Sequence, residues 1–125
     1  MTEKQQFVEA FKTRTKKFAI DVLKLCDEMP YNQNSTRIIS NQLGRSAGST
    51  AANYRAACIS RSDKEFYSKL SITIEEADES NLWLEILDEG KFYSDLAKIE
   101  TLKKESEEIY KTLSKARSTL KNRLE

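Results

Sequence analysis

The chain has 125 residues, which is enough for one domain with a single apolar core. It carries 21 basic and 20 acidic side chains, so its charge argues against strong non-specific binding of nucleic acid, and it has no apolar run long enough to cross a membrane. With only three glycines and one proline, the composition favours long helices over strands and turns.

Residues 3–28 are predicted to form the first helix, because apolar side chains recur at three- and four-residue steps along one stripe. Pro30 ends this helix, and the polar residues 31–34 form the turn after it. Ser35 or Thr36 is the expected N-cap of the next helix. The predicted inward stripe consists of Phe7, Phe11, Phe18, Val22, Leu25 and Met29.

Residues 36–60 are predicted to form the second helix, with small or apolar residues on two sides, so we expect it to be buried on both. Gly44 and Gly48 fit such a helix where another backbone comes close, since glycine costs about 1 kcal/mol relative to alanine in a helix. The alternative is a loop that breaks the helix between these two glycines. One face carries Ile39, Leu43, Ala47, Thr50, Tyr54 and Cys58, and the other carries Ile38, Ser49, Ala52, Ala56 and Ile59 around Arg45.

Residues 63–89 are predicted to form the third helix, which ends near Gly90. Ser62 and Glu65 have the spacing of a capping box at its start. The far face of this helix is acidic and yet holds the only tryptophan. The predicted core stripe is Phe66, Leu70, Ile74, Ala77 and Leu84, and the far face is Ile72, Glu75, Glu76, Glu79, Trp83 and Ile86.

Residues 95–122 are predicted to form the fourth helix, which begins near Ser94 or Asp95. Four long helices joined by short turns pack most simply as an all-α, up-down-up-down four-helix bundle, and we expect residues 1–125 to form one such domain. The inward positions of the fourth helix are Leu96, Ile99, Leu102, Ile109, Leu113, Ala116, Leu120 and Leu124, and its outward side carries Lys104, Lys111 and Lys115.

Charge is unevenly distributed along the chain. Residues 31–62 contain four basic and no acidic side chains, whereas residues 63–90 contain two basic and nine acidic ones. The outward faces of the second and third predicted helices therefore have opposite charge, and each complements the other rather than itself. This predicts a head-to-tail homo-oligomer anchored by Trp83. The alternative is that Trp83 packs against a loop of its own subunit. The predicted interface joins Arg37, Arg45 and Arg55 to Glu75, Glu76, Glu79 and Trp83.

A second hypothesis is that the assembled oligomer binds RNA or DNA, because repetition around a ring multiplies the field of a modest basic patch. The alternative is a solvated helix face with pairs such as Glu107 with Lys111. A third hypothesis is a protein adaptor whose partner no residue identifies. The candidate nucleic-acid-binding residues are Lys12, Lys16, Lys17, Lys104, Lys111 and Lys115.

Motifs for catalysis are missing from the sequence. The lack of histidine removes the usual general base and the commonest metal ligand. Residues 44–50 lack the lysine of a phosphate loop, and the glutamates of the third helix point away from the core that a di-metal bundle uses. The polar residues 1–6 are unlike a signal peptide, so we expect a cytoplasmic, non-enzymatic protein without metal or cofactor, whose Cys26 and Cys58 are reduced core residues.

Residues 42–56, 63–72 and 75–87 resemble the bacterial four-helix-bundle family of proteins encoded within intervening sequences of 23S ribosomal RNA genes. The Arg45-Ser46-Ala47, Ala52-Asn53-Tyr54 and Trp83-Leu84-Glu85 elements carry the resemblance in combination. A more distant resemblance is to the accessory variability determinant of diversity-generating retroelements, a ring-shaped homopentamer that binds nucleic acid and its reverse transcriptase. That resemblance implies five subunits, although the net charge of +1 departs from the strongly basic surface of that protein.

Overall fold

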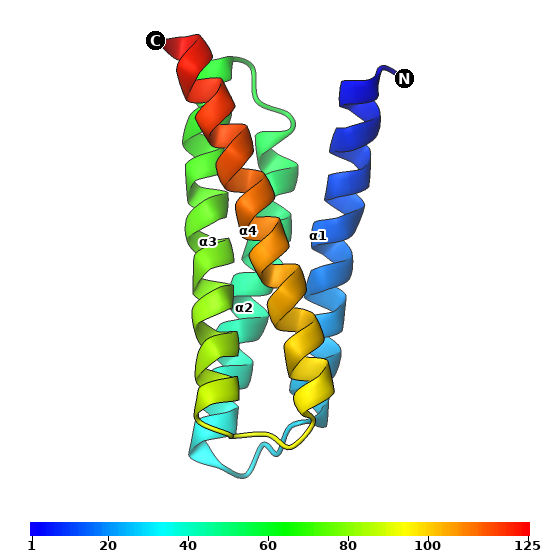
Figure 1. Ribbon diagram of the computed structural model, residues 1–125, viewed down its shortest axis with the longest axis vertical. Helices are drawn as coiled ribbons and strands as arrows, with labels where there is room; N and C mark the ends of the chain where they lie inside the picture. Colours follow the sequence, from blue (N-terminus) through cyan, green and yellow to red (C-terminus); the bar gives the residue numbers. More distant parts are fainter.

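The computed structural model describes residues 1–125 and contains four helices: α1 (Glu3–Glu28), α2 (Asn34–Ala57), α3 (Asp63–Glu89) and α4 (Leu96–Leu124). Successive helices run in opposite directions, and both chain termini lie at the same end of the molecule (Figure 1). Each helix contacts two neighbours, in the cycle α1, α2, α3, α4, and no diagonal pair is in contact. The predicted all-α, up-down four-helix bundle is confirmed.

Side-chain caps fix the start of three helices. The Thr2 hydroxyl accepts a hydrogen bond from the Gln5 backbone N–H at 3.1 Å, and the Gln5 side chain accepts one from the Thr2 N–H at 2.9 Å, which forms a capping box. The Ser62 hydroxyl caps α3 by accepting from the Glu65 N–H, and the Asp95 carboxylate caps α4 by accepting from the Lys98 N–H, both at 3.1 Å.

The start of α2 differs from the prediction. Gln33 occupies the N-cap position and makes no side-chain capping bond, so neither Ser35 nor Thr36 is the cap. Thr36 lies inside the helix, fully buried, and its hydroxyl donates to the carbonyl oxygens of Pro30 and Gln33. Thr36 therefore closes the preceding turn instead of capping the helix.

Most of the predicted stripes form one continuous core between the four helices. Four predicted core positions lie at the surface instead: Phe7, Leu96, Ala116 and Leu124. Three of them belong to the N-terminal half of α1 or the C-terminal half of α4, which diverge from each other at the end of the bundle where both termini lie (Figure 1). The buried core includes Phe11, Phe18, Val22, Leu25, Ile39, Leu43, Ala47, Tyr54, Leu70, Ile74, Ala77, Leu84, Ile99, Leu102, Ile109 and Leu113.

Helix α2 is unbroken through its two glycines, which excludes the alternative of a loop at this position. A Cβ atom built on Gly44 would lie 3.2 Å from Cδ2 of Leu23, so α1 approaches closely there. A Cβ atom on Gly48 would meet nothing within 4 Å. The second face of α2, around Arg45, is exposed at Ile38 and Ala52, so the expectation that the helix is buried on both sides fails within the subunit.

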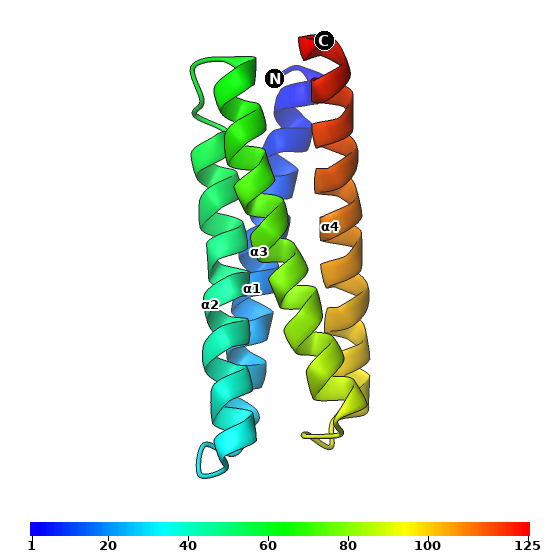
Figure 2. The same cartoon turned by 90° about the vertical axis from the view of Figure 1, so that its left-hand side faces the viewer.

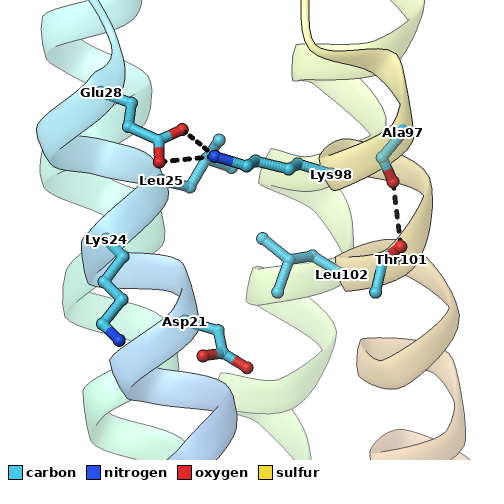
Figure 3. Close-up of a pocket in the computed structure, with 8 residues that line it drawn as sticks. All are labelled: Asp21, Lys24, Leu25, Glu28, Ala97, Lys98, Thr101 and Leu102. Carbon is cyan, nitrogen blue, oxygen red and sulfur yellow. Dashed lines mark hydrogen bonds and ion pairs between the residues drawn. The ribbon is translucent and has the colours of Figure 1, made fainter.

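Two ion pairs hold α1 and α4 together, one near the middle of α1 and one at its C-terminal end. Arg14 binds the Glu105 carboxylate through two nitrogens at 2.8 and 2.7 Å, and this hydrogen bonding raises the pKa of Arg14. Nζ of Lys98 donates to both carboxylate oxygens of Glu28, at 2.6 and 2.7 Å, across the mouth of a hollow with Leu102 in its wall (Figure 3). None of the four helices is long and apolar enough to cross a membrane.

Candidate interaction surfaces

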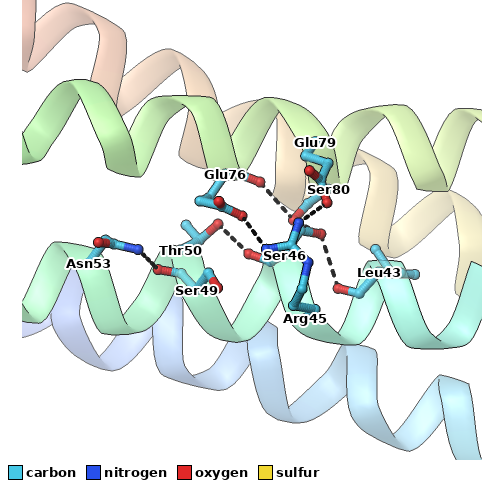
Figure 4. Close-up of polar contacts among 9 residues, drawn as sticks. All are labelled: Leu43, Arg45, Ser46, Ser49, Thr50, Asn53, Glu76, Glu79 and Ser80. Atoms are coloured by element: carbon cyan, nitrogen blue, oxygen red, sulfur yellow. Dashed lines mark hydrogen bonds and ion pairs between the residues drawn. The ribbon is translucent and has the colours of Figure 1, made fainter.

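Helices α2 and α3 lie side by side along a seam of small buried side chains (Figure 2). The Ser80 hydroxyl donates to the Ser46 hydroxyl at 3.0 Å, while the Thr50 hydroxyl donates to the carbonyl oxygen of Ser46 at 2.8 Å (Figure 4). Ser46 in turn donates to the carbonyl oxygen of Leu43 at 3.2 Å. Each buried hydroxyl on this seam therefore has a partner, and the small side chains let the helix backbones approach.

Arg45 joins the same two helices at the surface. Its guanidinium donates to Oε2 of Glu76 at 3.2 Å and also to Glu79, and the bond to Glu79 raises the pKa of Arg45 (Figure 4). The three residues were predicted to meet across a subunit boundary. Arg45, Glu76 and Glu79 come together within one chain instead. Their pairing between subunits stays a prediction, and a neighbouring subunit would have to compete with this contact inside the chain.

The remaining predicted interface residues are spread over several places. Arg37 interacts with Asn34 and lies over the ring of Tyr31, with 5.8 Å from its guanidinium carbon to the ring centroid. Glu75 is exposed and forms no ion pair. Trp83 is half-buried against the core of its own subunit, and its indole N–H makes no hydrogen bond. Trp83 therefore packs against the helical core rather than against a loop, and its part in a subunit contact stays a prediction.

The six candidate lysines do not form one patch. Lys12 and Lys16 of α1 line a hollow with Arg55 of α2, beside Gly48. Lys12 also pairs with Glu9 at 3.0 Å. On the other side of α1, Lys17 and Lys104 line a different hollow between α1 and α4. The structure thus brings Arg55 to the lysines of α1 rather than to Arg37 and Arg45.

Lys104, Lys111 and Lys115 form an exposed row on α4, which we call the α4 lysine stripe. Their spacing of seven and four residues places them on one face of the helix. None of the three forms an ion pair, and the pair between Glu107 and Lys111 that the alternative of a solvated helix face names is not made. Glu107 and Glu108 are also exposed and lie three or four residues from Lys104 and Lys111, so three positive charges stand beside two negative charges.

Beside the α4 lysine stripe lies a groove that the sequence did not indicate. It opens where α1 and α4 diverge, has a volume of about 320 Å³, and is walled by residues of all four helices. Phe7 was predicted to be a core residue but stands at this groove with 53% of its surface exposed. The periodicity of α1 is the same whether or not a neighbour covers its first turns, so no signal in the sequence distinguishes the two cases.

The structure contains no cluster of side chains arranged as a metal site. No three side chains of the types Cys, Asp and Glu are grouped so that they could hold a metal ion. Cys26 and Cys58 are not disulfide-bonded, and burial raises the pKa of both thiols, which keeps them protonated at neutral pH. The Cys26 thiol donates to the carbonyl oxygen of Ser40 at 3.4 Å.

A family model described as 23S rRNA-intervening sequence protein matches residues 10–115, from the second turn of α1 to the last part of α4. The chain belongs to this family. The resemblance seen in residues 42–87 is therefore confirmed, and the family covers the α2–α3 seam as well as the α4 lysine stripe. Phe7 and the part of the groove wall beyond residue 115 lie outside the matched range.

Among solved structures, the chain is similar to a crystallised protein of unknown function from the S23 ribosomal protein family of Bacteroides thetaiotaomicron. The two chains are 28% identical and superpose with a TM-score of 0.75 over 89% of this chain and 97% of the other. No curated protein matches this member of the intervening-sequence family. The comparisons thus establish the family and the bundle.

Proposed function

We propose that the protein is a non-catalytic, homo-oligomeric accessory factor that associates with nucleic acid. The observation that carries this proposal is the α4 lysine stripe, where Lys104, Lys111 and Lys115 are exposed and bound to no carboxylate. Lysines held in internal ion pairs, such as Lys98 with Glu28, have their charge already compensated. Unpaired lysines in a row are available to phosphates.

Oligomerisation is supported by the unlike outer faces of α2 and α3. Ile38 on α2 and Ile59 in the turn directly after that helix are exposed, Ile59 to 77%. On α3, Ile72 and Leu82 are exposed beside the acidic residues of that helix. An apolar face free of acids and an apolar face rich in acids fit each other better than either fits itself, which favours head-to-tail contact and closure into a ring.

The two proposed surfaces do not overlap. The subunit contact uses the side of the bundle formed by α2 and α3, whereas the α4 lysine stripe lies on the diagonal neighbour of α2. Each subunit of a ring would therefore present its own stripe, so the positive field grows with the number of subunits although each is nearly neutral. We propose five subunits, on the resemblance to the accessory variability determinant.

Charge reversal of the α4 lysine stripe tests the nucleic-acid part of the proposal. The triple variant Lys104→Glu, Lys111→Glu and Lys115→Glu should lose retention of labelled RNA at low salt and keep the mass of the unmodified oligomer in light scattering. The unmodified protein should bind less tightly as salt increases, because phosphate contacts release counterions.

The matched control is a second triple variant with the same change in net charge, made from exposed lysines elsewhere: Lys24→Glu, Lys64→Glu and Lys91→Glu. This control should retain most of the binding. Equal loss in both variants would show that only total charge matters and that the stripe is not the site. An oligomer that binds no RNA or DNA at low salt would overturn the nucleic-acid part and leave the protein-adaptor alternative.

A further inference from the structure

The groove between the diverging halves of α1 and α4 has the composition of a ligand site rather than of a packing defect. Its floor consists of core side chains, among them Phe11, Tyr54 and Leu113, and it opens to solvent at Phe7. Open clefts of a few hundred Å³ lined mainly by apolar groups, with a few polar groups at the mouth, are typical of binding sites between the helices of a bundle. Here the polar groups include the hydroxyls of Thr112 and Thr119.

Phe7 provides a flat aromatic platform at the mouth of the groove. Its ring lies nearly parallel to that of Phe11, with an interplanar angle of 9° and 5.8 Å between centroids. Phe11 in turn meets the Tyr54 ring edge-on at 4.9 Å. The inner rings are thus fixed by the core, while Phe7 remains half-exposed. A further flat ring could extend this stack on the open side of Phe7.

Positive charge borders the groove along its α4 wall. Lys115 follows Thr112 by three residues and precedes Thr119 by four, so it adjoins both on the helix surface, and Lys111 is one turn away. On the opposite wall, Lys4 of α1 lines the groove. Arg123 pairs with Asp63 at 3.6 Å at one end, so that pair adds no net charge. An aromatic platform therefore lies between cations on both walls.

We propose that this groove takes a base of single-stranded nucleic acid, stacked on Phe7, while the sugar-phosphate backbone follows the α4 lysine stripe. This inference rests on the proposed function and makes it more specific. An aromatic ring beside a basic track is the usual arrangement for single strands, whose unstacked bases are free to insert. In a duplex the bases are already stacked on one another, so no base is free to stack on Phe7. The Thr112 and Thr119 hydroxyls and the Asp63 carboxylate can hydrogen-bond the polar edge of the inserted base.

The test compares a short fluorescein-labelled oligouridine with a labelled RNA hairpin of equal length, by fluorescence anisotropy on the intact oligomer. Phe7→Ala should weaken binding of the single strand by roughly tenfold or more, since one base stacked on an aromatic ring contributes about that factor. Binding of the hairpin should change little. Phe7→Tyr should keep the affinity for the single strand, whereas Phe7→Leu, which keeps apolar volume but lacks the aromatic face, should lose it.

Two controls separate this inference from the proposed function. Ile20→Ala removes another exposed apolar side chain of α1 and should leave both affinities unchanged. Phe7→Trp adds a tryptophan at the groove, so oligouridine should quench the fluorescence of this variant more than that of the unmodified protein, whose single tryptophan is Trp83, if a base stacks there. Suppose that the triple variant of the α4 lysine stripe loses single-strand binding, that Phe7→Ala does not change it, and that no fluorescence is quenched. This result would overturn the groove inference and leave the proposed function standing. No binding of either RNA would overturn both.

Discussion

At the scale of single residues, two glycines one turn apart in α2 have opposite surroundings. Gly44 packs against Leu23 of α1, whereas no atom lies within 4 Å of a Cβ built on Gly48. Both glycines weaken the helix, because glycine has the lowest helix propensity after proline. Whether alanine stabilises the protein at either position is therefore decided by the space around the new methyl group.

We expect Gly48→Ala to stabilise the folded subunit by about 0.5–1 kcal/mol, the difference in helix propensity between the two residues. Gly44→Ala should gain less or lose stability, since its Cβ would lie 3.2 Å from Cδ2 of Leu23. Urea denaturation of both variants, followed by circular dichroism at the same protein concentration, measures the difference. Greater destabilisation by Gly48→Ala than by Gly44→Ala would mean that the surface at Gly48 is covered in the oligomer more tightly than Gly44 is within the subunit.

At the scale of helices, the spacing between α2 and α3 is set by the small side chains of their seam. Ser80 is fully buried and donates to Ser46 at 3.0 Å and to the carbonyl oxygen of Glu76 at 3.2 Å. A hydroxyl so close to the neighbouring helix leaves no room for extra methylene groups, and a well-packed interior resists overpacking. The seam is therefore sensitive to volume more than to the hydrogen bond itself.

We expect Ser80→Leu to destabilise the protein by about 1–3 kcal/mol through overpacking, while Ser80→Ala should cost about 1 kcal/mol or less, because Ser46 still donates to Leu43. Ser68→Leu is the matched control, since this serine is exposed on the same helix. Urea denaturation gives all three values. An equal effect of leucine at positions 68 and 80 would show that helix α3 can move away from α2 at little cost.

The sequence predicted these helices well because each one has its own apolar period. Phe11, Leu43, Leu70 and Ile109 are examples, one from each helix, of predicted core residues that are buried. It could not predict how far α1 and α4 diverge, because a stripe specifies which side faces inward and not where its neighbour ends. Phe7 has the spacing of a core residue and is half-exposed for that reason. The cap of α2 was missed because Thr36 satisfies its hydroxyl on the preceding turn instead.

At the scale of the whole molecule, the candidate surfaces depend on relations between helices that a linear sequence does not contain. The charge difference between residues 31–62 and 63–90 was visible in the sequence, but part of it is used within the subunit, where Arg45 pairs with Glu76 and Glu79. Arg55 is instead beside Lys12 and Lys16. Residues that remain exposed and unpaired are therefore the better probes of a subunit contact.

The polarity of that contact gives the sharpest prediction for the assembly. Ile59→Glu places an acid in the turn directly after α2, and Leu82→Arg places a cation on the outer face of α3. Both side chains are exposed, so the fold should survive. Each variant alone should be monomeric in light scattering coupled to size exclusion, because each keeps only one working face and a head-to-tail contact needs two unlike faces.

Mixed in equal amounts, the two variants should form a dimer and nothing larger. The intact α3 face of Ile59→Glu can bind the intact α2 face of Leu82→Arg, and the two faces left over are the damaged ones. A two-fold contact, in which the same face of both subunits meets, would behave differently. The variant whose substitution lies outside that face would remain an oligomer on its own, and mixing would not restore assembly of the other variant. An unmodified protein that is monomeric would show that the outer faces of α2 and α3 serve another partner.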